Sequence, residues 1–161
     1  MSKRIKEVVI PLEKAVFRLD GQGFWRNQEG RFRNKKIIDH FHRSISRDEN
    51  GYFVSQDKGG IIEKVYFPCE DTAFFVFDVI FNDDITLVLN TGRQMPLMPG
   101  KLFTRNDNLY IETASDRIKF TDRALMKLSG LFEESGNNGL AIRIHSRLYP
   151  IPERADWEPN S

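Results

Sequence analysis

Cysteine is nearly missing from this sequence, since Cys69 is the single example among 161 residues. An intramolecular disulfide needs two cysteines, and a multi-thiolate zinc or iron–sulfur site needs more, so the sequence excludes both. This composition favours a reducing compartment.

Long apolar runs are also missing. The longest, residues 73–77, ends at Asp78, whereas a membrane span needs roughly 20 apolar residues. The apolar stretch at residues 8–12 contains Pro11 and stops at Glu13, which is too short for the apolar region of a signal peptide. We therefore expect a soluble, cytoplasmic protein that does not associate with membranes.

Neither sign of charge is in excess, because 24 Lys and Arg residues face 23 Asp and Glu residues, for a net charge of +1. No strong global field draws the chain to nucleic acid, so any basic patch must be local. Phenylalanine is abundant, with 13 residues, and large rings bury much apolar area. We expect a well-filled aromatic core.

Two segments about 85–88 residues apart follow the same order, which indicates an internal repeat. Each has an aromatic strand, a turn, a short strand and then an amphipathic helix, expected at residues 35–46 and 122–134. Asn34 and Thr121 are the predicted N-caps, because their side-chain oxygens can accept a free backbone N–H. Gly-containing pairs are expected at the helix exits: Asn50-Gly51 and Asn138-Gly139. One apolar stripe per helix is expected to be buried: Ile37, Ile38, Phe41, Leu125, Leu128 and Phe132.

Apolar or alternating stretches predict strands at residues 63–68, 73–81, 85–89, 102–105 and 140–144. Asn82-Asp83-Asp84 predicts a hairpin tip, whereas Pro150, Pro152 and Pro159 are expected to prevent further regular structure. The predicted fold is α+β, with two similar lobes from an internal repeat, each a small antiparallel sheet with one main helix. The predicted lobes are residues 15–95 and 96–152, followed by a loose tail at residues 153–161.

Several short motifs occur in an order that points to a known family. They are Gly23-Phe24-Trp25, Gly30-Arg31, Arg47-Asp48, Glu63-Lys64-Val65 and Glu70-Asp71-Thr72-Ala73-Phe74. Over about residues 18–150 this order resembles a bacterial family of unknown function, number 1285. Residues 61–75 are most similar, with Ile61-Ile62 in place of the family's Pro-Val. The resemblance implies two similar α/β lobes and supplies no activity.

The sequence contains no recognisable motif for binding a metal ion or a nucleotide. His40 and His42, two residues apart on a helix, would point about 200° away from each other and cannot chelate one ion. Gly21-Gln22-Gly23 is followed by Arg26 where a third glycine of a dinucleotide loop belongs. We expect no metal and no cofactor.

Charge is distributed unevenly along the chain. Residues 26–47 hold seven basic residues against Glu29 and Asp39: Arg26, Arg31, Arg33, Lys35, Lys36, Arg43 and Arg47. Residues 70–84 hold five acidic residues and no basic one. Such segments can complement each other between lobes or subunits, although two solvated faces are the simpler interpretation.

The favoured function is a non-catalytic module that binds a ligand or a protein at a site between the two lobes, with a regulatory or signalling role. Pseudo-symmetric lobes create a cleft, and no catalytic signature is present. The partner is then a small molecule, another protein or a second copy of the chain. The polar or amphipathic members of the family-like segments are the candidate site residues: Trp25, Arg47, Glu63, Asp71 and Asn90.

Two alternatives stay open. A small-substrate enzyme would use Glu63, Glu70 or Asp71 with His42 or Cys69, although the neighbouring carboxylates disfavour a Cys69 thiolate. A nucleic-acid-binding protein would use the Arg26–Arg47 strip, with Phe24 and Trp25 as stacking rings. The net charge of +1 argues against this second alternative.

Overall fold

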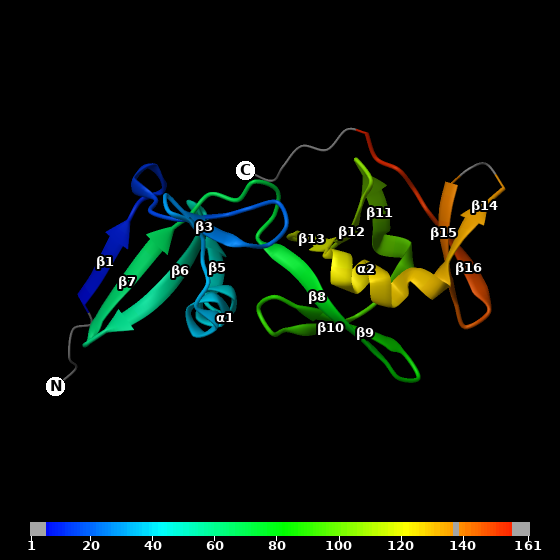
Figure 1. The fold of residues 1–161 in the computed structure, drawn as a ribbon, viewed down its shortest axis with the longest axis horizontal. Helices are drawn as coiled ribbons and strands as arrows, with labels where there is room; N and C mark the ends of the chain where they lie inside the picture. Colours follow the sequence, from blue (N-terminus) through cyan, green and yellow to red (C-terminus); the bar gives the residue numbers. More distant parts are fainter. Residues whose placement is uncertain (1–5, 137–138, 156–161) are drawn as a thin grey trace. The chain divides into compact units, whose positions relative to one another are not determined.

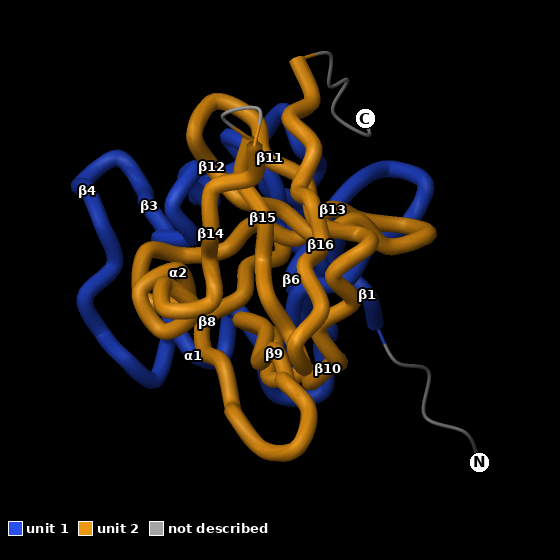
Figure 2. The backbone as a smooth tube through the Cα atoms, turned by 90° about the vertical axis from the view of Figure 1, so that its right-hand side faces the viewer, with its two compact units in different colours: residues 1–73, 161 blue, residues 74–160 orange. Residues whose placement is uncertain are grey.

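The computed structural model of the protein describes residues 6–136 and 139–155. These residues form two compact units, unit 1 up to residue 73 and unit 2 from residue 74 (Figure 2). The predicted boundary at residues 95/96 lies inside unit 2. The division falls earlier because residues 74–81 form a strand that pairs with residues 118–120 and so belongs to the second unit.

The described part of unit 1 contains two sheets, one α-helix and one short 3-10 helix, η1 (Figure 1). One sheet has the order β2-β3-β4, and the other has the order β1-β7-β6-β5, with β1 parallel to β7. The elements follow in the order β1 (Lys6–Ile10), η1 (Leu12–Lys14), β2 (Arg18–Leu19), β3 (Trp25–Asn27), β4 (Gly30–Arg31), α1 (Lys35–Arg43), β5 (Ile45–Asp48), β6 (Gly51–Lys58) and β7 (Ile61–Tyr66).

An aromatic cluster forms the core of unit 1. Its ring centroids lie 4.7–6.3 Å apart, in the edge-to-face and tilted geometries that aromatic pairs prefer. The rings come from α1 and from four separate segments around it: Phe17, Trp25, Phe32, Phe41 and Phe67. The aromatic core predicted from the phenylalanine content is therefore present.

Helix α1 begins where the sequence predicts. The Asn34 side chain accepts a hydrogen bond from the Ile37 backbone N–H at 3.2 Å, so Asn34 is the N-cap. The helix ends at Arg43 because Ile45 starts β5, which shortens the predicted range 35–46. Phe41 is buried as predicted, but Ile37 is 46% exposed and does not belong to the core.

The described part of unit 2 contains one large mixed sheet, one small antiparallel sheet, one α-helix and the short 3-10 helices η2 and η3. The large sheet has the order β10-β9-β8-β13-β12-β11, and the small one has the order β14-β15-β16. The elements follow in the order β8 (Phe74–Phe81), β9 (Ile85–Leu89), β10 (Gln94–Pro96), η2 (Pro99–Lys101), β11 (Leu102–Arg105), β12 (Asn108–Glu112), β13 (Arg117–Phe120), α2 (Asp122–Leu128), η3 (Ser129–Leu131), β14 (Phe132–Ser135), β15 (Gly139–Ile144) and β16 (Arg147–Ile151).

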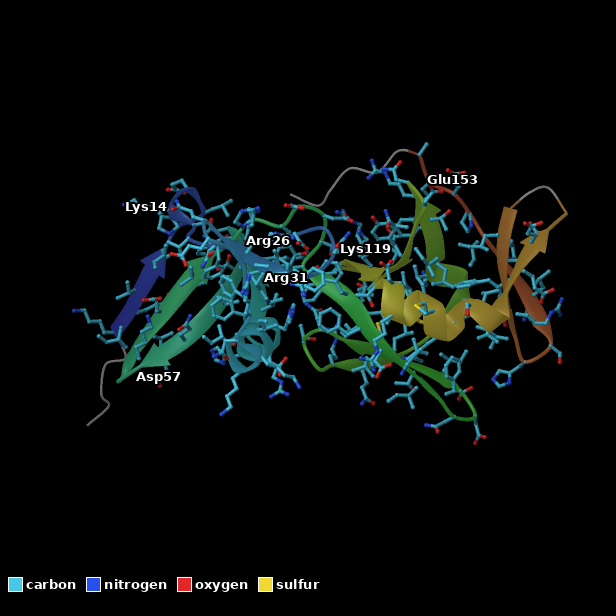
Figure 3. The ribbon with its side chains drawn as sticks, in the orientation of Figure 1. Lys14, Arg26, Arg31, Asp57, Lys119 and Glu153 are labelled. Atoms are coloured by element: carbon cyan, nitrogen blue, oxygen red, sulfur yellow. The ribbon has the colours of Figure 1, made fainter. Side chains whose placement is uncertain are left out.

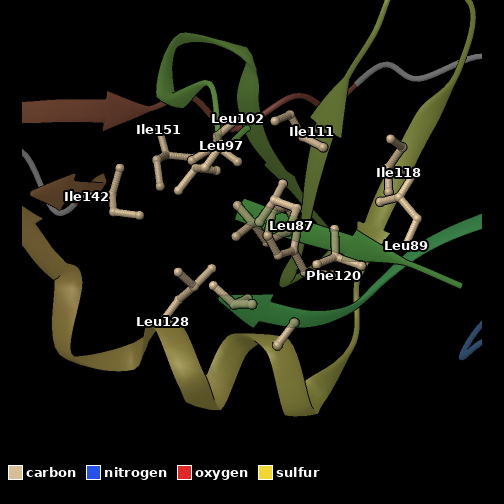
Figure 4. Close-up of a cluster of buried hydrophobic side chains, with 14 residues drawn as sticks. Leu87, Leu89, Leu97, Leu102, Ile111, Ile118, Phe120, Leu128, Ile142 and Ile151 are labelled. Atoms are coloured by element: carbon tan, nitrogen blue, oxygen red, sulfur yellow. The ribbon is translucent and has the colours of Figure 1, made fainter. Parts of the chain in front are cut away.

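Helix α2 packs against one face of the large sheet, and the apolar core of unit 2 lies between them (Figure 4). Thr121 is the N-cap, as predicted, because its side-chain oxygen accepts from the Ala124 N–H at 3.3 Å. Leu128 is fully buried. The helix ends there because Phe132 already starts β14, which leaves Phe132 half-buried and shortens the predicted range 122–134.

Two expectations about glycine and proline differ from the structure. Asn50 lies in the turn between β5 and β6 and Gly51 begins β6 with φ of 120°, so the pair does not lie at a helix exit. Pro150 lies within β16, although prolines were expected to end regular structure. Strand β16 is at the edge of its sheet, where a missing N–H removes no ladder hydrogen bond when it points outward. Asn138 lies outside the described residues.

The fold is α+β, with strands dominating. In both units an antiparallel series of three short strands leads into a helix, and a second such series follows it. The first series are β2-β3-β4 and β11-β12-β13, and the second are β5-β6-β7 and β14-β15-β16. Each unit has two sheets, one of them mixed, instead of the single small antiparallel sheet that was predicted for each lobe. The internal repeat of two similar lobes stays a prediction.

Candidate ligand-binding cleft

Unit 2 contains an open cleft of about 560 Å³. It lies against α2, the β11–β12 hairpin, β14, β15 and the end of β16. Apolar side chains make up half of its lining: Leu109, Leu125, Met126, Phe132, Leu140 and Ile151. The rest of the lining is Thr104, Asp107, Asn108, Ser129, Gly139 and Glu153.

The floor of the cleft is continuous with the core of unit 2. Leu109 and Ile151 are buried members of that core, and Leu125 and Leu140 pack against it while remaining partly exposed. Met126 stands at the rim with 76% of its surface exposed. A ligand in the cleft therefore meets fixed apolar side chains below and a flexible thioether at the edge.

A tight turn positions Asp107 at one side of the cleft. Arg105 and Asn108 are paired across the β11–β12 hairpin, and the two residues between them, Asn106 and Asp107, have φ of 49° and 63°. Asn and Asp tolerate this left-handed conformation better than most residues. The Asn108 Nδ2 amide donates to the Asn106 carbonyl oxygen at 3.1 Å.

Glu153 is held beside β11 by backbone hydrogen bonds (Figure 3). The Thr104 N–H donates to the Pro152 carbonyl at 2.9 Å, and the Arg154 N–H donates to the Thr104 carbonyl at 2.8 Å. Residues 153 and 154 are therefore not loose, in contrast to the predicted tail at residues 153–161. Residues 156–161 lie outside the described chain.

Two of the sequence-predicted site residues have structural roles. Trp25 is 1% exposed in the core of unit 1, and its indole Nε1 donates to His42 Nδ1 at 3.3 Å. Asn90 belongs to unit 2 and is buried. Its Oδ1 accepts from the Phe75 N–H at 3.0 Å and its own N–H donates to the Phe75 carbonyl at 2.9 Å. Asn90 thereby fixes the end of the β8–β9 hairpin.

The other three predicted site residues belong to unit 1. Arg47 is opposite Tyr52, with its guanidinium 5.9 Å from the ring centroid, and Glu63 forms an ion pair with Lys58 at 3.6 Å. Arg47 pairs with Tyr52 of β6, and Glu63 pairs with Gln56 of the same strand. Tyr52 and Gln56 are four residues apart, so Arg47 and Glu63 are separated by roughly 13 Å along the strand direction. The structure does not bring Arg47 and Glu63 together. Asp71 is partly buried beyond β7.

The groups of the enzyme alternative also have structural roles. His42 is 3% exposed, and burial lowers its pKa to about 4 although Asp39 acts in the opposite direction. Glu70 Oε2 accepts from the Gly21 N–H at 3.0 Å, and its Oε1 lies 3.5 Å from Arg18 Nε. Cys69 forms a backbone bridge with Leu19.

A charged cluster that the sequence analysis did not identify lies on β5 and β7. Lys64 Nζ lies 2.5 Å from Asp48 Oδ2 and 4.1 Å from the centroid of the Phe53 ring, and the Tyr66 hydroxyl donates to the same carboxylate at 2.6 Å. The hydrogen bonds from Lys64 and Tyr66 lower the pKa of Asp48 to about 2, and Asp48 raises the pKa of Lys64. The alternation of Lys64 and Tyr66 on one strand was the available sequence signal.

No group of three or more histidine, cysteine, aspartate or glutamate side chains converges as a metal site among the described residues. The described helices are also too short or too polar to cross a membrane.

Two solved structures share this fold. One is a DUF1285 family protein from Silicibacter pomeroyi DSS-3 at 2.50 Å resolution, with a TM-score of 0.59 and 14% identity over 91% of this chain and 83% of that one. The other is a DUF1285 family protein from Shewanella baltica OS155 at 1.40 Å, with a TM-score of 0.51 and 13% identity over 73% of this chain and 93% of that one. No family model and no curated protein matches the sequence. The chain therefore has a DUF1285-like fold, as its sequence resemblance indicated.

Proposed function

We propose that this chain is a ligand-binding module with a regulatory role and that its ligand enters the cleft of unit 2. The supporting observation is the cleft itself. Its volume of about 560 Å³ falls within the roughly 300–1,000 Å³ of small-molecule sites. An apolar floor with a few polar groups at the rim is also typical of such sites.

This proposal replaces the five residues selected from the sequence with the lining of one cleft. The indole N–H of Trp25 and the side-chain oxygen of Asn90 form internal hydrogen bonds, which leaves both residues poorly suited to contact a ligand. Leu125, Leu140 and Met126, by contrast, are accessible from the cleft.

A binding role also fits the electrostatics better than acid–base catalysis. Hydrogen bonds from Lys127, Arg143 and Lys64 lower the pKa values of Asp78, Glu133 and Asp48, respectively. A carboxylic acid that serves as a general acid near neutral pH needs a raised pKa. The shifts on these carboxylates are those of ion pairs that hold strands and helices in place.

The test is a titration with 1-hexanol, a neutral apolar probe, followed by methyl NMR. We expect saturable shifts at the Leu125 and Leu140 methyl groups. Leu140→Trp, which fills the cleft, should weaken binding by at least tenfold. Leu148→Trp is the matched control, because Leu148 is an exposed leucine on β16 outside the cleft lining. Equal binding by the two variants, or no saturable shift in the wild type, contradicts the proposal.

A further inference from the structure

We infer that the ligand of the unit 2 cleft is a small amphipathic cation, with an apolar body and an ammonium or guanidinium group. This inference rests on the proposed function and adds the charge and hydrogen-bonding character of the ligand to it. Three observations support it: the volume of the cleft, the charge of the ionisable side chains at its rim, and the internal hydrogen bonds that already engage donor groups of the other polar lining residues.

Among the described residues, the ionisable side chains that line the cleft are two carboxylates, Asp107 and Glu153. Both are exposed, and neither has a hydrogen bond or an ion pair to another side chain in the described parts of the chain. The basic residue next to Glu153 does not neutralise it. Arg154 binds Glu112 at 2.8 Å, and its guanidinium lies 4.3 Å from the centroid of the Phe103 ring.

The neutral polar groups of the lining also use donors internally. The Asn108 amide donates to the Asn106 carbonyl at 3.1 Å, and the Ser129 hydroxyl donates to the Met126 carbonyl at 2.7 Å. Asn108 Oδ1 and the Ser129 oxygen keep lone pairs that can accept. The rim therefore offers mainly acceptors, and the matching ligand is a donor with positive charge.

The apolar floor determines the rest of the ligand. Leu125, Leu140 and Phe132 present partly exposed apolar surface that an aliphatic or aromatic body can cover. An anionic ligand of the same size would have to approach two carboxylates, and like charges brought together disfavour binding. The cleft thus favours a ligand whose positively charged group faces the rim and whose apolar surface faces the floor.

The experiment compares three probes of equal chain length: hexylammonium, 1-hexanol and hexanoate. Each is titrated into the full chain and followed by the Leu125 and Leu140 methyl signals at about 20 mM salt, where screening is weak. We expect hexylammonium to bind roughly five- to tenfold more tightly than 1-hexanol, as two exposed ion pairs allow, and hexanoate to bind most weakly. About 500 mM salt should remove most of the difference.

Asp107→Asn/Glu153→Gln should abolish the preference for the amine over 1-hexanol. Asn tolerates the positive φ at position 107, so the turn is preserved. The matched control is Asp83→Asn/Glu134→Gln, which removes the same charge at two exposed residues outside the cleft lining.

The outcomes separate the two proposals. If the three probes bind equally, or if the amine preference survives in Asp107→Asn/Glu153→Gln, the inference is wrong and the binding function stands. If none of them binds the wild type, or if Leu140→Trp binds them as the wild type does, the proposed function itself is wrong.

Discussion

Individual buried polar residues explain much of the internal organisation of unit 1. Asp20 is 6% exposed, and burial alone would raise its pKa. The hydrogen bonds from Arg26, Phe24 and Gln22 outweigh this effect and lower the pKa. Asp20 thereby holds the loop before β3 in a fixed conformation. In Asp20 the charged form is favoured, whereas in His42 the neutral form is favoured, because its ring is buried and accepts a hydrogen bond from Trp25.

We predict that His42 makes the protein less stable at mildly acidic pH. In the unfolded chain histidine takes up a proton near its ordinary pKa of about 6.5, whereas the folded protein does so only near pH 4. The stabilisation is therefore complete above pH 6.5 and is lost as the pH falls towards 4, by about 3 kcal/mol at most. Urea unfolding at several pH values between 4.5 and 7.5 measures this loss.

Two variants isolate the contribution of His42. His42→Gln keeps an acceptor for Trp25 but does not titrate, so its stability should fall much less over the same pH range. His40→Gln removes an exposed histidine of the same helix and should retain the wild-type pH dependence. A His42→Gln profile that parallels the wild type contradicts the assignment.

Element boundaries show what sequence patterns could and could not predict. The strands at residues 85–89 and 102–105 were predicted to the residue, because short apolar runs there are bounded by turn residues. Both helices were predicted too long. Ile45 and Phe132 continue the helical spacing but also suit the first position of a strand, and strand pairing determines which structure forms.

The two-residue turns of the β-hairpins differ in how well their residues suit the backbone. In three of the described two-residue turns both residues have positive φ. Gly59-Gly60 and Asn106-Asp107 have the residue types that positive φ favours, whereas His145 and Ser146 have φ of 50° and 66° without glycine or asparagine. The turn between β15 and β16 is therefore the least favourable of these three.

Ser146→Gly should raise the free energy of unfolding by about 0.5–1 kcal/mol, because glycine removes the steric cost of positive φ and this outweighs its greater freedom in the unfolded chain. Chemical denaturation measures the change. Ser55→Gly is the control, since Ser55 lies in the middle of β6, where glycine should destabilise the strand. If both variants lose stability, the proposed role of the turn is wrong.

At the scale of the whole molecule, the sequence indicated the family resemblance and the order of elements but not the cleft. The cleft is built from separate elements spread over residues 104–153, none of which has a recognisable ligand motif. Leucines such as Leu125 and Leu140 look in the sequence like ordinary core residues. Their partial exposure follows only from how α2 and β15 pack. Trp25 was selected for its amphipathic character, which is equally suited to a core position.

The charge distribution predicts that the chain does not bind nucleic acid with micromolar affinity. The net charge is +1, Trp25 is buried, and the Arg31 guanidinium occupies one face of the Phe24 ring at 3.7 Å from its centroid. Arg26 is paired with Asp20 at 2.7 Å. Fluorescence anisotropy with duplex and single-stranded oligonucleotides at about 50 mM salt should detect no binding.

A contrary result has a clear signature. Seven phosphate contacts on duplex DNA would give a log–log salt slope near −6. Micromolar affinity with such a slope, lost in Arg31→Ala/Lys35→Ala, would make nucleic acid the leading partner.

The two parallel strand pairings determine the order in which each unit can fold. Among the described strands, every other ladder joins strands that are neighbours along the chain, whereas β1 pairs with β7 and β8 pairs with β13 across long intervening segments. Hairpins and helices form within microseconds because their contacts are local, but a long-range ladder must first overcome the entropy of loop closure. We therefore expect the β1–β7 and β8–β13 ladders to form after the hairpins and to limit the folding rate of their units.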